Sequence, residues 1–291
     1  MNTNPSTRFS FLKAIGLFMG ASFFAYLLSV AIHESGHYLA SIILGIPEKG
    51  IALNPFGSNY NYDYLWDTST PLRGAFMAAA GPLFDLLITV TVSLLLWRKR
   101  SPALLPLLLL GSYALIHESV AMIMVLIDAY GDWSLVISLG VPSSVVGLLA
   151  IAFLAAGCIW MLLLLPLVGI NPQSSIWRKI VVLLAGIPLL FLFAVVYQTL
   201  FGVDQYVPTL SAWATMENVR KAKIIFMVAS TVLTAIITPL HRPLFPWLDR
   251  LSHTPAARVR TQDVLLAMAL GVAIVVIQLV FFTDPTVVVK R

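Results

Sequence analysis

The stretch Ala31-Ile32-His33-Glu34-Ser35-Gly36-His37-Tyr38-Leu39-Ala40 has the pattern H-E-x-x-H and lies inside a long apolar run, from about residue 15 to residue 46. Two histidines four positions apart lie on the same face of an α-helix, about one turn from each other. This spacing lets both imidazoles bind a single Zn²⁺, and Glu34 then stands where it can take a proton from a water at the metal. A chance occurrence of the pattern is the alternative, but ionisable residues in apolar segments are costly and usually functional.

The composition excludes an ordinary soluble domain. Hydrophobic residues make up 59% of the 291 residues, charged residues make up 11%, and the mean hydropathy is +0.91. Soluble domains carry about 25% charged residues. Basic residues lie at the ends of apolar runs, as in Arg98-Lys99-Arg100, so the net charge of +5 indicates membrane interfaces and not a nucleic-acid partner. We therefore expect a multi-pass integral protein of the cell membrane, embedded in the lipid bilayer.

Seven apolar runs predict an all-α polytopic membrane protein with about seven transmembrane helices, because a membrane barrel would instead show short alternating strands. The first run, residues 15–44, would form a helix of roughly 45 Å against a bilayer core of about 30 Å. This helix must therefore tilt, protrude or be sheltered by protein. The other expected spans are residues 72–96, 102–127, 144–167, 181–201, 224–240 and 264–282.

The stretch after the first helix differs in kind from the rest of the chain. Residues 50–64 read Gly-Ile-Ala-Leu-Asn-Pro-Phe-Gly-Ser-Asn-Tyr-Asn-Tyr-Asp-Tyr, which combines β-forming residues with turn residues. We expect a small extended, β-like segment here. The alternative is a plain connecting loop with tyrosines at the membrane interface.

A hydrolytic zinc site needs three protein ligands and an open position for water. His33 and His37 supply two ligands, so the third must come from the polar residues within or beside the later spans. Gly131 could break the third helix so that the aspartate after it points inward. The residues alone leave several candidates for the third ligand, namely Asp85, His117, Glu118, Asp128 and Asp132.

Three blocks of the sequence resemble the site-2 protease family of intramembrane zinc metalloproteases. His33-Glu-Ser-Gly-His37 matches the family's H-E-x-G-H, and Ala79-Ala-Gly-Pro-Leu83 is similar to the Gly-Pro block of its second core helix. Gly131-Asp-Trp133, followed by Leu139-Gly-Val-Pro142, is similar to the segment that carries the family's aspartate ligand. The resemblance implies an intramembrane zinc-protease core of three helices at residues 1–142. Residues 143–291 then add transmembrane helices of unknown role.

Residue by residue, the resemblance implies that His33, His37 and Asp132 bind zinc and that Glu34 is the catalytic acid–base. Asp128, one helical turn before Asp132, is the rival third ligand, and either aspartate could instead be a solvated residue after a helix end.

The sequence also departs from the family pattern. Asp85 stands near a position where the family often has asparagine, and residues 101–132 contain no asparagine upstream of the aspartate. His117 and Glu118 could support the ligands from behind, or they could be buried polar groups that pair with their neighbours.

The expected function is that of an intramembrane zinc endopeptidase, which hydrolyses peptide bonds in or near transmembrane segments of membrane-protein substrates. Such a substrate helix must unwind locally, and residues 50–64 could pair with it by strand addition. The alternatives are a membrane transporter or channel with buried ionisable residues, and a non-proteolytic relative that binds membrane partners. The clustering of ionisable residues in the first half favours zinc over transport, and Glu34 argues against an inactive relative.

Overall fold

The computed structural model describes residues 5–45, 50–52, 60–62, 70–128, 131–171, 173–186, 192, 224, 228, 231–239 and 258–281. Within this part, five helices are long and apolar enough to cross a membrane, namely Ser10–Ile43, Leu72–Lys99, Pro102–Ile127, Ser143–Val168 and Thr261–Gln278. They coincide with five of the spans predicted from the sequence, so the prediction of a mainly helical fold with membrane-length apolar helices is confirmed. Of the two other predicted spans, residues 181–201 lie mostly outside the described residues, and residues 224–240 are described only in part, at 224, 228 and 231–239.

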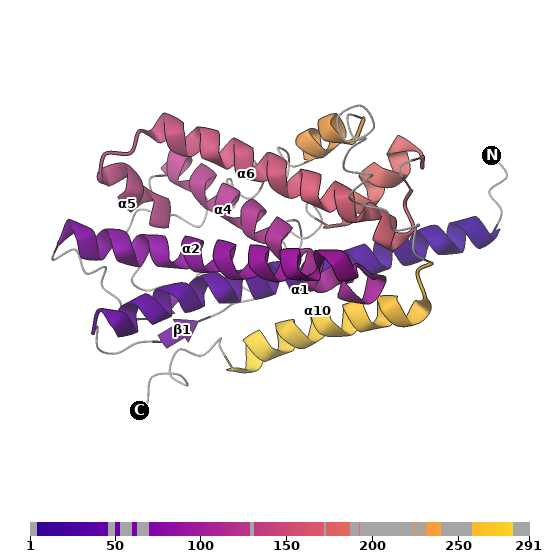
Figure 1. The fold of residues 1–291 in the computed structure, drawn as a ribbon, viewed down its shortest axis with the longest axis horizontal. Helices are drawn as coiled ribbons and strands as arrows, with labels where there is room; N and C mark the ends of the chain where they lie inside the picture. Colours follow the sequence, from indigo (N-terminus) through magenta and orange to yellow (C-terminus); the bar gives the residue numbers. More distant parts are fainter. Residues whose placement is uncertain are drawn as a thin grey trace.

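Helix α1 (Pro5–Ile43) contains both histidines of the H-E-x-x-H pattern. Its 39 residues extend over roughly 58 Å, about twice the thickness of a bilayer core. Protein covers much of this length, because α2 (Pro71–Leu96), α4 (Leu110–Asp128) and α10 (Thr261–Phe281) all contact α1. The N-terminal turns of α1 reach beyond the other labelled helices (Figure 1). The long helix is therefore both sheltered and protruding.

Helix α2 begins with clear sequence signals and then lies close against α1. Thr70 caps it, because its side chain accepts a hydrogen bond from the Arg73 N–H at 3.3 Å, and a proline occupies the first turn. Small residues allow the close contact with α1: a Cβ added at Gly36 would lie only 2.5 Å from the Ala80 carbonyl oxygen. The Ala79–Leu83 block thus serves helix–helix approach.

Helix α4 lies centrally, in contact with α1, α2 and α6 (Ser143–Leu164). Two short 3₁₀ turns, η1 (Trp97–Lys99) and η2 (Pro102–Leu104), and the short helix α3 (Leu105–Leu108) connect α2 to α4. Ser112 Oγ donates a hydrogen bond to the Gly157 carbonyl at 2.9 Å, and Ser119 Oγ donates one to the Ala150 carbonyl at 2.8 Å. These bonds join α4 to α6 and satisfy both hydroxyls in apolar surroundings.

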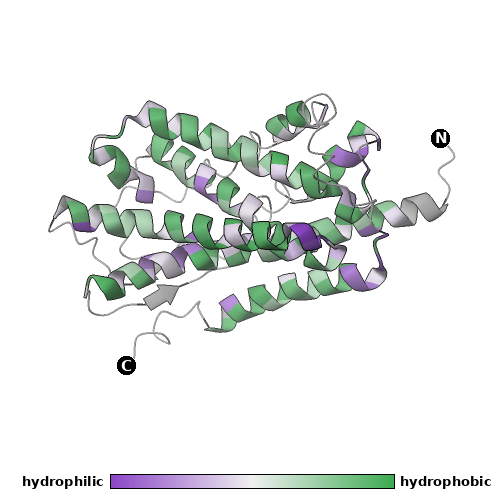
Figure 2. Ribbon diagram, viewed as in Figure 1, coloured by the Kyte–Doolittle hydropathy of each residue, from purple (hydrophilic) through white to green (hydrophobic). Residues whose placement is uncertain are grey.

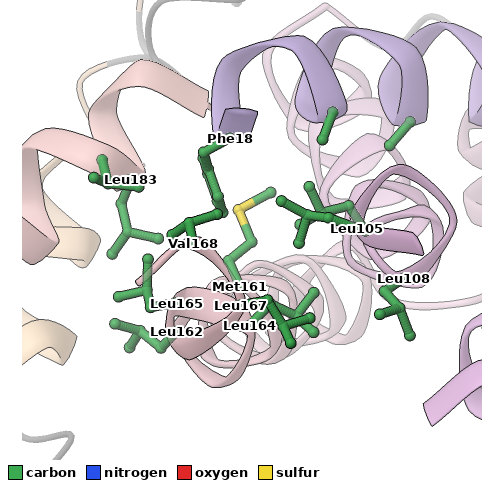
Figure 3. Close-up of a cluster of buried hydrophobic side chains, with 14 of the residues drawn as sticks. Phe18, Leu105, Leu108, Met161, Leu162, Leu164, Leu165, Leu167, Val168 and Leu183 are labelled. Atoms are coloured by element: carbon green, nitrogen blue, oxygen red, sulfur yellow. The ribbon is translucent and has the colours of Figure 1, made fainter. Parts of the chain in front are cut away.

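The main apolar core lies away from the histidines. Figure 3 shows Phe18 of α1 packed among leucines of α3, α6 and the 3₁₀ turn η3 (Leu165–Val168). Phe18 is about four helical turns before His33 along α1. The outward faces of the spans are apolar too (Figure 2), as exposed Leu83 and Leu87 of α2 illustrate. Helices that are apolar on all sides are typical of membrane spans.

Two short strands follow α1. β1 (Gly50–Ala52) and β2 (Tyr60–Tyr62) pair antiparallel with the register Gly50↔Tyr62, Ile51↔Asn61 and Ala52↔Tyr60, and both contact α1. The other residues of the stretch 50–64 lie outside the described part of the chain. The role of this stretch as a substrate-binding edge stays a prediction.

Candidate metal centre

The structure brings together His33, His37 and Asp132, the three residues that the family resemblance implies as zinc ligands. Asp132 Oδ2 lies 3.1 Å from His33 Nε2 and 3.2 Å from His37 Nε2, and the two Nε2 atoms are 3.2 Å apart. Both histidines come from α1, whereas Asp132 is the first residue of α5 (Asp132–Ser138). Figure 1 shows α5 at the same end of the bundle as the C-terminal half of α1.

The partners of the other ring nitrogens determine what the two Nε2 atoms can do. His37 Nδ1 donates to the Met77 carbonyl at 2.8 Å, and His33 Nδ1 donates to Glu118 Oε1 at 2.9 Å. Because a carbonyl and a carboxylate only accept hydrogen bonds, each Nδ1 carries the hydrogen. In a neutral imidazole, Nε2 then presents a lone pair. The lone pairs of both Nε2 atoms therefore converge with the Asp132 carboxylate oxygen. Because electron-rich atoms repel one another at this distance, the arrangement requires positive charge between them.

The separations fit a tetrahedral metal ion. A zinc ion about 2.0–2.1 Å from each of its ligand atoms separates those atoms by roughly 3.3 Å in tetrahedral geometry. The three observed separations, 3.1, 3.2 and 3.2 Å, lie close to this value. Two imidazoles and one carboxylate are also a ligand set that zinc commonly accepts, with a fourth position left for water or substrate.

Gly131 positions Asp132. Helix α4 ends at Asp128, and Gly131 has φ +107°, a backbone conformation that other residues rarely adopt. The chain then starts α5, with the Ser134 hydroxyl donating to the Gly131 carbonyl at 2.6 Å. Burial alone would raise the pKa of the Asp132 carboxyl, but the positive charge and N–H donors that His37 and His33 carry when protonated outweigh this effect and hold the pKa well below its usual range. Asp132 is therefore ionised at neutral pH, as a metal ligand must be.

Gly81 makes room for His37. A Cβ at position 81 would overlap the His37 imidazole, including its Nε2 atom. The sequence singled out Gly81 only as part of the Ala79–Leu83 block, and no local pattern indicates that this glycine lies directly against the His37 ring. Only a residue without a side chain lets α2 pass so close to the ring.

Glu34 lies beside this group without belonging to it. Glu34 is 8% exposed, and its carboxylate is not part of either described group whose ligand atoms converge. His33, His37 and Asp132 all lie within electrostatic range of it. A carboxylate in this position is available to a water molecule or a substrate at the centre.

Asp85, His117 and Glu118 were candidates for the third ligand, and the structure places them behind His33 instead. Asp85 is fully buried and accepts hydrogen bonds from Ser29 Oγ at 2.8 and 3.1 Å. His117 Nδ1 lies 3.6 Å from Asp85 Oδ2 and 3.8 Å from Glu118 Oε1, too far for hydrogen bonds. With His33 these three form a second group that could hold a metal ion.

Some contacts of the centre could not be found from the motifs. The sequence did not indicate that the Met77 carbonyl accepts from His37, or that the Trp133 indole donates to Glu118, because neither residue belongs to a metal-binding pattern. Ser29 carried a weak signal, since it stands four residues before His33 on the same face of the helix. The side chain of Asp128, the rival ligand, lies outside the described part of the structure.

No protein-family model, curated protein or solved structure matches this chain. A functional assignment therefore rests on the residues and their geometry.

Proposed function

We propose that this protein is an intramembrane zinc endopeptidase of the site-2 protease type, acting on membrane-protein substrates in or near their transmembrane segments. The observation that supports this proposal best is the convergence of His33 Nε2, His37 Nε2 and Asp132 Oδ2 at separations of 3.1–3.2 Å, inside a helical bundle suited to a membrane. The proposal includes seven spans, a location in the cell membrane and a protease core at residues 1–142.

Each residue has a distinct task in this proposal. His33, His37 and Asp132 hold the zinc ion, which when bound polarises a peptide carbonyl and lowers the pKa of a water molecule to about 7. Glu34 accepts a proton from that water and later returns it to the leaving amine. Burial of the centre excludes bulk water and strengthens these interactions.

The test compares the full chain with its Glu34→Gln variant in lipid nanodiscs. Elemental analysis measures zinc per chain, and a labelled single-span membrane protein in the same nanodiscs reports cleavage. Glu34→Gln should keep one zinc but slow cleavage by about 10²–10⁴-fold, because it removes proton transfer and leaves the three ligands in place.

Two results would contradict the proposal. If Glu34→Gln cleaves at nearly the wild-type rate, Glu34 is not the acid–base. If the wild type binds zinc but cleaves none of a panel of single-span substrates, the centre is not proteolytic, and ion flux into proteoliposomes then tests the transporter alternative.

A further inference from the structure

We infer that Glu118 is a positioning residue that fixes two of the three metal ligands at once; this inference rests on the proposed metal centre. Glu118 Oε1 accepts a hydrogen bond from His33 Nδ1 at 2.9 Å. Glu118 Oε2 accepts one from Trp133 Nε1 at 3.1 Å. Trp133 directly follows Asp132 in α5, so one carboxylate is joined to a histidine ligand and to the neighbour of the aspartate ligand.

The surroundings of Glu118 suit this role. The residue is fully buried on α4, and its two N–H donors come from two other helices, α1 and α5. A buried carboxylate is costly unless donors satisfy both oxygens, and charge-assisted hydrogen bonds of this kind are short and strong. The two donors therefore stabilise the Glu118 anion, and the anion in turn fixes the hydrogen on His33 Nδ1 and the docking of α5.

A second metal ion is the competing use of the same carboxylate, because Glu118 also belongs to the group with His33, Asp85 and His117. However, His33 Nδ1 must keep its hydrogen if His33 Nε2 is to face the first centre. Both oxygens of Glu118 are already engaged by N–H groups. Only Asp85 and His117 then remain, and two protein ligands do not make a closed or a catalytic zinc site. The group is better explained as the support of His33, whose ring the His117 ring contacts edge-on at 4.9 Å between centroids.

The experiment measures zinc affinity of the full chain in detergent by competition with a chelator. Glu118→Gln should weaken zinc binding by about 10–100-fold, because the amide can accept only one of the two N–H bonds and its NH₂ group faces the other donor. Trp133→Phe should weaken binding less, because it removes only the indole N–H bond to Glu118 and keeps an aromatic side chain. Ser112→Ala is the matched control: it removes a buried hydrogen bond from the same helix, between Ser112 and the Gly157 carbonyl, without touching Glu118, and zinc affinity should stay within about twofold of wild type.

The double variant tests whether both effects pass through one carboxylate. If they do, adding Trp133→Phe to Glu118→Gln should cost less affinity than Trp133→Phe costs in the wild type, because the carboxylate that links the indole to His33 is already gone. Co²⁺ bound in place of zinc gives an independent signature: its visible absorption spectrum should change in Glu118→Gln and stay unchanged in Ser112→Ala. A purely structural role of Glu118 would lower thermal stability without altering the spectrum.

Several outcomes would overturn the inference. Three results would overturn it while leaving the first centre intact. They are wild-type zinc affinity in Glu118→Gln, additive losses in the double variant, and a second zinc ion that is lost in His117→Ala. Absence of zinc from the wild type would overturn the metal centre together with this inference. If Glu118→Gln does not fold, Trp133→Phe alone decides, and unchanged affinity in that variant overturns the inference. Because affinity is the readout, the test gives its answer whether or not the protein is a protease.

Discussion

At the scale of single residues, the third ligand is the point on which the sequence left a choice. Asp132→Ala should reduce zinc from one per chain to well below one, because it removes one of three ligands that lie 3.1–3.2 Å apart. Asp128→Ala should keep its zinc. Elemental analysis of both purified variants makes the comparison. Full zinc in Asp132→Ala together with loss in Asp128→Ala would reverse the assignment.

Gly81 gives a second prediction at this scale. Gly81→Ala should lower zinc affinity by at least about tenfold, because the new methyl group overlaps the His37 ring and forces it to turn away from Asp132. The control is Gly147→Ala, where the added Cβ would meet only the end of Leu126 at 3.4 Å, an ordinary contact. Chelator competition on both variants measures the zinc affinity. Wild-type affinity in Gly81→Ala would show that the His37 ring can accommodate the methyl group without moving from its ligand position.

The sequence could predict that the two histidines lie together, but it could not predict which residues form hydrogen bonds with them. The spacing of His33 and His37 fixes a common helix face, so their meeting was predictable from local geometry. The distance between Glu118 and His33, 85 positions apart in the chain, depends on how α1 and α4 pack. No local pattern encodes that packing, and so the sequence left open whether Glu118 supports a ligand or pairs elsewhere.

At the scale of elements, the predicted role of β1 as an edge that binds an extended substrate can be tested by proline substitution. Successive residues of a strand direct their N–H groups to opposite edges, so Ile51→Pro and Ala52→Pro interrupt different edges of β1. One should break the pairing with β2, and the other should remove an N–H from the free edge. If a substrate strand adds to that free edge, cleavage of a single-span substrate should fall in the corresponding variant while zinc content stays unchanged. Undiminished cleavage in both variants would show that the substrate is held elsewhere.

The spans themselves were predictable because membrane crossing depends on length and hydropathy, which are local properties. Five predicted runs have described counterparts, and their ends agree within a few residues. Which spans lie side by side was not predictable in the same way. The contact of α4 with α6 depends on hydroxyls such as Ser112 and Ser119, whose carbonyl partners lie 45 and 31 positions away. Serines in a span give no indication of which helix they face.

At the scale of the whole molecule, α1 and α10 pack together from opposite parts of the sequence. A Cβ at Gly20 would lie 2.8 Å from the Met268 backbone nitrogen. Gly20→Ala should therefore destabilise the protein by about 1–3 kcal/mol, the usual cost of overpacking, because a backbone atom cannot move aside as a side chain can. Thermal unfolding in detergent measures this, with Gly147→Ala as the control, and an unchanged midpoint would show that α10 shifts at little cost.

The same pairing sets an order of events during synthesis. Gln278 of α10 donates a hydrogen bond to the Leu27 carbonyl of α1 at 3.2 Å, across 251 positions of the chain. Ribosomes add about 5–20 residues per second, so residues 261–281 follow residues 5–43 by roughly 10 to 50 seconds. During that interval, lipid or another protein must cover the face of α1 that later meets α10. A ribosome that stalls or terminates before residue 261 leaves a nascent chain that already carries both histidines on a helix still open along one side.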